Sequence, residues 1–84
     1  MAYKLFTRVS LGEDFPEHGL HKGDLATIVD RHEGKPDQET GYSLEIFNAV
    51  GETIAVLVVE ESKSNPVREN EILHVRRFDK VAAI

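Results

Sequence analysis

The 84-residue sequence predicts a small all-β fold. Short stretches of alternating apolar and polar residues recur at spacings of about ten residues, separated by glycine and proline, and none carries a convincing helical period. The most informative stretch is residues 19–30, where two glycines bracket a polar turn and a β-branched strand follows at once. Together these observations favour a five-stranded SH3-like antiparallel barrel with room for one short 3-10 turn.

The first two strands are expected at residues 5–11 and 24–31. In the first, the odd-numbered residues face one way and the even-numbered residues the other. The second carries apolar residues on both faces, as a central or strongly curved strand does. The loop between them contains Pro16, which cannot donate to a ladder. Phe15 and Leu20 are expected to plug one end of the core.

The third strand is expected at residues 42–47, where Tyr42, Leu44 and Ile46 alternate with polar neighbours. Phe47 breaks the outward polar series, so an exposed Phe47 would indicate an interface. A hairpin connection follows, in which Gly51 can adopt a positive φ.

The fourth strand, residues 53–59, has two apolar faces. One face carries Ala55, Leu57 and Val59, and the other carries Ile54, Val56 and Val58. A single sheet would leave one of these stripes in water, so something must cover it. Barrel closure, the C-terminal segment and another copy of the chain are the three candidates.

A fifth strand is expected near residues 73–78, after a polar stretch that stops at Pro66 and a turn at residues 67–72. The sequence shows no internal repeat or linker. We therefore expect one domain over residues 1–84, with its core at about residues 4–78 and a C-terminal tail at residues 79–84.

The amino-acid composition excludes several classes of partner and site. Fifteen acidic and ten basic side chains give a net charge of −5, which disfavours nucleic acid and anionic membranes and suits a basic partner. The absence of cysteine excludes disulfides and thiolate zinc sites, so a thin core is expected to gain stability by oligomerisation.

The longest apolar run, residues 54–59, is too short to span a membrane, and the N-terminus lacks an apolar signal core. We expect a cytoplasmic protein.

The sequence gives little support for a catalytic site or a metal site. His18 and His21 are close in sequence, but His32 and His74 fall on other elements, and a zinc site needs three or four convergent ligands. No serine lies in a nucleophile elbow, and the paired carboxylates lack an apolar setting that would raise a pKa. We expect no enzyme activity, catalytic residue, metal, cofactor or small-molecule substrate.

The surplus of apolar residues on the second face points instead to a protein partner or a homo-oligomer. The tail, residues 81–84, either folds back over its own barrel or contacts another chain. The first hypothesis is a non-enzymatic protein-interaction module, and its candidate interface residues are Phe47, Ile54, Val56, Val58, Phe78 and Ile84.

An RNA-binding or translation-associated barrel is the alternative hypothesis. It would use Arg76, Arg77, Lys22 and exposed aromatic side chains. Arg76 and Arg77 would point to opposite faces of a strand, and acidic neighbours offset them. Ion pairs or an exposed rim are therefore the favoured interpretation of the C-terminal basic residues.

Several ordered segments resemble one family of small bacterial proteins, domain-of-unknown-function family 4926 (DUF4926). They are Gly19-Leu20-x-x-Gly23-Asp24-x-Ala26-Thr27-Ile28-Val29, Gly41-Tyr42-Ser43-Leu44-Glu45, Glu61-Ser62 and Arg68-Glu69-Asn70-Glu71. The likeness runs from about Leu5 to Arg76. It implies an SH3-like barrel with no established activity. Some members are encoded beside another small protein, which implies a partner-binding, antitoxin-like role.

Overall fold

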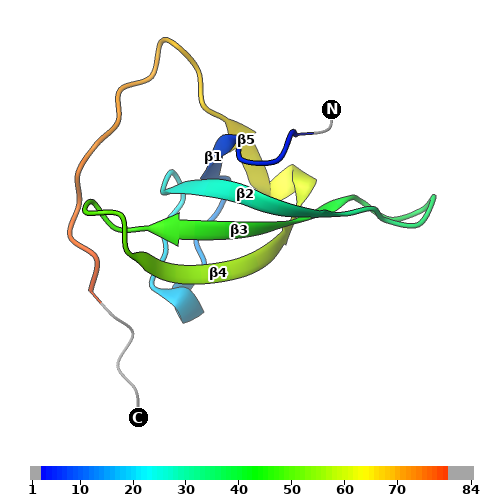
Figure 1. Ribbon diagram of the computed structural model, residues 1–84, viewed down its shortest axis with the longest axis horizontal. Coiled ribbons are helices and arrows are strands. Elements are labelled where there is room, and N and C mark those ends of the chain that lie inside the picture. Colours follow the sequence, from blue (N-terminus) through cyan, green and yellow to red (C-terminus); the bar gives the residue numbers. More distant parts are fainter. Residues whose placement is uncertain (1–2, 80–84) are drawn as a thin grey trace.

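The computed structural model describes residues 3–79 and folds them into one antiparallel sheet of five strands (Figure 1). The strands are β1 (Arg8–Leu11), β2 (Leu25–His32), β3 (Gly41–Phe47), β4 (Thr53–Glu60) and β5 (Ser64–Pro66). Two 3-10 turns, η1 (Pro16–His18) and η2 (Glu61–Lys63), lie in this part of the chain, where one was expected. The all-β, five-stranded prediction is confirmed.

The sheet is open. Its strand order is β4-β3-β2-β1-β5, so β4 and β5 are its two edges and do not pair with each other. The word barrel therefore describes this curved sheet only loosely.

One face of the sheet forms the core, as the alternation predicts. Tyr42 and Leu44 of β3 are fully buried, and Leu57 and Val59 of β4 are nearly so. The expected plug is also present, because Leu20 is buried and pairs with Phe15, which packs against the core. The buried apolar residues are Val9, Leu11, Leu20, Ala26, Ile28, Tyr42, Leu44, Ile46, Leu57 and Val59.

The first strand is shorter than the predicted residues 5–11. Residues 4–7 turn, with the Thr7 N–H donating to the Lys4 carbonyl at 3.3 Å, and β1 starts only at Arg8. Phe6 lies in this turn with a φ of 67°, in the left-handed region that disfavours side chains with a Cβ. Alternation alone did not reveal the turn.

The predicted fifth strand at residues 73–78 is wrong. The fifth strand is β5, a polar segment that pairs with β1, and residues 67–79 contain no strand. The chain reaches β1 because η2 folds it back directly after β4. The Gly12 N–H donates to the Lys63 carbonyl at 2.6 Å, and a Cβ on Gly12 would lie 2.8 Å from that oxygen. Only glycine allows this close approach.

The β3–β4 hairpin has the expected glycine geometry, with Gly51 at a φ of 88°. The Asn48 side-chain oxygen accepts the backbone N–H groups of Val50 and Glu52, at 3.1 and 2.9 Å. The ladder is irregular between Ile46 and Phe47, where the hairpin begins. This turn fixes the register that sorts the β4 side chains between the two faces.

Candidate functional site

The outer face of β3 and β4 carries exposed apolar side chains. In the ladder, Val56 lies opposite Glu45 and Val58 lies opposite Ser43, so all four share the face away from the core. Val56 is 57% exposed, Val58 65% and Phe47 43%. We call Phe47, Val56 and Val58 the outer stripe.

The outer stripe borders a free sheet edge. β4 pairs with β3 and with no other strand of the described sheet, although it is eight residues long. Such an edge presents backbone N–H and C=O groups that can pair with another extended chain. Natural sheets commonly protect long edges with charges, proline or bulges. Here the middle of β4, residues 54–59, has neither charge nor proline.

Acidic residues lie around this edge. Glu52 and Glu60 are exposed at the two ends of β4. Glu45 lies on the outer face, where its Oε2 accepts the Thr53 hydroxyl at 2.5 Å. The edge therefore combines an apolar centre with negatively charged surroundings.

After β5 the chain forms a long arm, residues 67–79, which we call the strap. Figure 1 shows the strap leaving the sheet and passing across the ends of β2, β3 and β4. It does not run alongside any of these strands. It begins with a turn in which the Arg68 N–H donates to Glu71 Oε1 at 2.6 Å and the Glu71 N–H donates to the Arg68 carbonyl at 3.1 Å.

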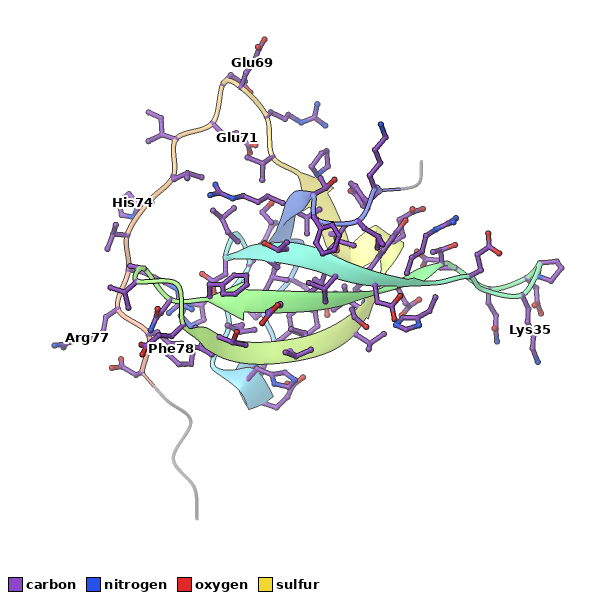
Figure 2. All side chains as sticks on the ribbon, in the orientation of Figure 1. Lys35, Glu69, Glu71, His74, Arg77 and Phe78 are labelled. Carbon is purple, nitrogen blue, oxygen red and sulfur yellow. The ribbon has the colours of Figure 1, made fainter. Side chains whose placement is uncertain are left out.

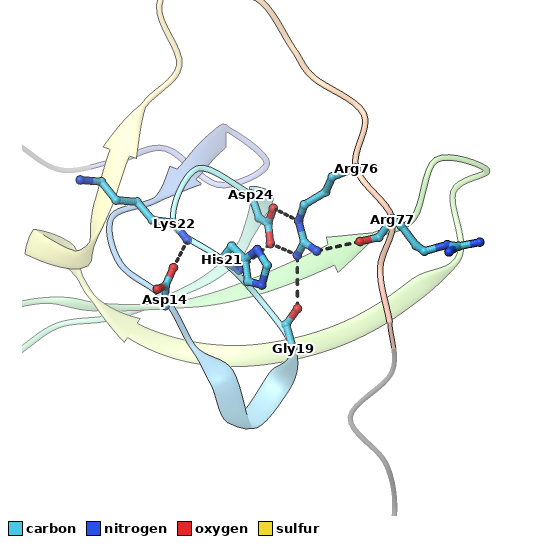
Figure 3. A network of polar contacts seen from close by, with 7 residues as sticks. All are labelled: Asp14, Gly19, His21, Lys22, Asp24, Arg76 and Arg77. Carbon is cyan, nitrogen blue, oxygen red and sulfur yellow. Dashed lines mark hydrogen bonds and ion pairs between the residues drawn. The ribbon is translucent and has the colours of Figure 1, made fainter.

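The far end of the strap is tied to the body by Arg76 (Figure 3). Its guanidinium donates to both carboxylate oxygens of Asp24, at 2.8 and 2.5 Å, and to the Gly19 carbonyl at 3.2 Å. Bidentate pairing of this kind gives a defined geometry as well as attraction. We call this contact the latch. It confirms an ion pair for Arg76.

The latch also sets the ionisation of Asp24. Burial on its own would raise the pKa of this carboxyl, but hydrogen bonds from the Arg76 guanidinium and the His21 backbone N–H outweigh burial and lower the pKa below its ordinary value. The Asp24 carboxylate in turn raises the pKa of Arg76. Asp24 is thus charged, and the latch closed, at neutral pH.

Beside the latch, Phe78 turns toward the sheet and packs against the core, whereas Arg77 points away (Figure 2). The rest of the strap stands clear of the sheet. An open hollow of about 1030 Å³ separates it from β1, β2 and the β3–β4 hairpin. The strap is therefore held at its two ends and unsupported in between.

The unsupported part of the strap exposes large apolar side chains. Ile72 is 92% exposed, Leu73 55% and Val75 87%. The sequence interpretation placed Ile72 in a turn and Leu73 and Val75 in a strand, and so missed their exposure. Their exposure could have been anticipated, because a segment that finds no strand to pair with leaves its apolar residues in water.

The predicted interface residues do not form one surface. Phe47, Val56 and Val58 lie together on the outer face, but Ile54 and Phe78 are half-buried against the core. Ile84, together with the tail at 81–84, lies outside the described residues. The irregular register at the hairpin accounts for Ile54, because it separates this residue from the regular outward series.

The residues behind the other hypotheses are dispersed. Within residues 3–79, no three His, Asp or Glu side chains gather as a metal site would require. Arg76 is engaged in the latch, and Arg77 and Lys22 are exposed. The RNA-binding hypothesis stays a prediction. No helix in the described range is long and apolar enough to cross a membrane.

Fold and surface together define a small all-β protein with one open antiparallel sheet and a free apolar edge. Residues 5–65 match the model of one family, Domain of unknown function (DUF4926), and the chain belongs to that family. The match ends before Arg76, so the strap lies beyond it. Comparison with curated proteins gave no match, and comparison with solved structures gave none either.

Three of the segments that carry the family likeness, residues 19–29, 41–45 and 61–62, meet in the structure. Tyr42 donates its hydroxyl to Glu61 Oε1 at 2.8 Å, which joins the β3 segment to η2. Gly19 and Asp24 flank the turn that leads into β2, and the Asp24 carboxylate accepts the His21 N–H at 2.7 Å. These contacts stabilise the fold.

Proposed function

We propose that this protein is a non-enzymatic protein-interaction module and that its binding surface is the β4 edge with the outer stripe. The observation that carries the proposal is the coincidence of an unpaired eight-residue edge with Val56 and Val58 exposed beside it. Addition of a strand to such an edge is a common mode of protein recognition, in which backbone hydrogen bonds supply affinity and alternate side chains supply specificity.

The surroundings of the edge indicate the chemistry of the partner. An added strand would place one set of alternate side chains beside Val56 and Val58 on the outer face and the other set beside Leu57 and Val59. The second set should be apolar, because Leu57 and Val59 are buried. Its ends would lie near Glu52 and Glu60, and the net charge of −5 adds a long-range attraction for cations. The partner segment is therefore extended, apolar at alternate positions and basic.

The test compares the wild type with Val58→Lys. Val58 is largely exposed, so the variant should fold, while the lysine places a charge in the centre of the binding surface. Light scattering measures self-association, and affinity purification from the cells that make the protein measures a separate partner. Association that is present in the wild type and lost in Val58→Lys is expected. A wild type that stays monomeric at high concentration and recovers no protein would contradict the proposal.

A further inference from the structure

The strap has the composition of a strand but pairs with none. Within residues 72–79, no backbone N–H donates to the backbone carbonyl of another described residue. The stretch Ile72–Phe78 contains β-branched and other large apolar residues, and two arginines. These are the properties that the β4 edge requires of its partner, namely an extended segment, apolar side chains and positive charge.

The same chain cannot readily make this pairing. The latch and Phe78 hold the strap across the strand ends, whereas a pairing segment must lie alongside β4 (Figures 1 and 3). A second copy has no such restriction, and it offers the same free edge. If each copy adds its strap to the β4 edge of the other, the result is a closed two-fold dimer.

We propose that residues 72–78 of one copy add to the β4 edge of a second copy, and that two copies exchange these segments reciprocally. This inference rests on the proposed function and names its partner as a second copy. An antiparallel register with Val75 opposite Leu57 would place Leu73 beside Val59, which extends the buried face. Arg76 would then lie on the outer face, in the same row as Val56 and Glu45.

The exchange requires the latch to open. Arg76 either pairs with Asp24 of its own chain or lies along the second copy, so the two states compete for one segment. Weakening the latch should therefore favour the dimer. Arg76 itself takes part in both states, which makes Asp24→Asn the suitable change. This variant is expected to dimerise at a lower concentration than the wild type.

Three matched variants of the full chain distinguish the strap, which donates the pairing segment, from the β4 edge, which accepts it. Val75→Lys alters the strap, Val58→Lys alters the β4 edge, and Val50→Lys alters a hairpin valine that is 80% exposed and belongs to neither. The exchange predicts loss of the dimer for Val75→Lys and for Val58→Lys, and an unchanged dimer for Val50→Lys. Mixing the first two should restore a heterodimer, because one intact junction remains.

Cysteine cross-linking then tests the geometry, and the chain has no cysteine of its own. One copy carries Val58→Cys, and its partner carries a single cysteine at successive positions from 72 to 78. Strand pairing predicts a disulfide yield that alternates along the segment, highest at His74 in the register above. A flat or absent yield overturns the exchange.

The outcomes separate the two proposals. If Val58→Lys abolishes the dimer and Val75→Lys does not, the edge is the interface and the exchange is wrong. If both variants dimerise like the wild type, both proposals are wrong. A monomeric wild type that still captures a protein through Val58 overturns the exchange and leaves the proposed function standing.

Discussion

Tyr42 illustrates how a single buried side chain joins distant parts of this small core. Its hydroxyl donates to Glu61 and accepts the Tyr3 N–H at 3.0 Å, and its ring meets the Tyr3 ring edge-on at a centroid distance of 5.5 Å. The N-terminal segment, β3 and η2 are thus connected through one side chain. Sequence alternation predicted that Tyr42 faces inward but gave no indication of these partners.

Tyr42→Phe should lower the free energy of unfolding by about 1–3 kcal/mol, because it removes the hydroxyl that accepts the Tyr3 N–H and donates to Glu61. Urea denaturation measures the loss. Tyr3→Phe is the control, since the Tyr3 hydroxyl makes one longer bond, 3.2 Å, to the Ser64 carbonyl. Equal losses in the two variants would contradict the central role given to Tyr42.

Phe6 combines a positive φ with a side chain that is 74% exposed. Its ring gains little from burial, while its backbone conformation is unfavourable for most residues. Asn tolerates this conformation better. Phe6→Asn should therefore raise the free energy of unfolding by about 0.5–1 kcal/mol, measured by thermal denaturation. A lower melting temperature would show that the phenylalanine makes a compensating contact.

Phe47 tests the outer stripe from its β3 side. Phe47→Ser removes a half-exposed ring, so we expect the free energy of unfolding to fall by about 1–2 kcal/mol and the domain to remain folded. Association should weaken, but less than in Val58→Lys, because Phe47 lies on the strand behind the edge. Sedimentation velocity measures association and circular dichroism measures folding. Unchanged association would remove Phe47 from the interface.

Among the elements, the latch between the strap and the β2 turn makes a prediction about pH. The pKa of Asp24 is lowered in the folded protein, so the stabilising contribution of the latch is present above the unfolded pKa of about 3.9 and is lost as the pH falls through the folded pKa. NMR titration of the Asp24 carboxyl carbon measures this pKa. Arg76→Gln should shift it upward toward its ordinary value. An unchanged pKa would mean that Arg76 does not hold the carboxylate in solution.

Three of the five strands could be predicted closely because glycine turns and alternation agree there. The β3–β4 hairpin is the clearest example, since Gly51 fixes the turn and the register sorts Leu57 inward and Val58 outward. The fifth strand could not be predicted in this way. A strand needs a free neighbouring edge as well as a suitable sequence, and β5 obtained one beside β1 through the Gly12–Lys63 contact.

The candidate site could be predicted only in part for the same reason, because the sequence does not show which strand edges are free. The sequence indicated that one face of β4 would need a cover, and Val56 and Val58 are indeed exposed. It could not show that the sheet stays open, because closure depends on whether β4 meets β5. Nor could it pair Asp24 with Arg76, which is 52 residues away along the chain.

Considered as a whole, the protein has a thin core, a free edge and an arm of strand-like sequence held away from the sheet. A small domain with no disulfide gains from association, and each copy offers both an acceptor edge and a donor segment. In the proposed dimer, the charge of −5 on each copy opposes association at long range, and the local attraction between the arginines and the acidic edge would have to exceed this repulsion.

The most direct test is amide hydrogen exchange of residues 53–60, measured as a function of protein concentration or of added partner. If β4 is the binding edge, those of its amides that point away from β3 should become protected when the complex forms, and Val58→Lys should prevent this. A complex that forms while the β4 amides exchange at their monomer rates would contradict the account.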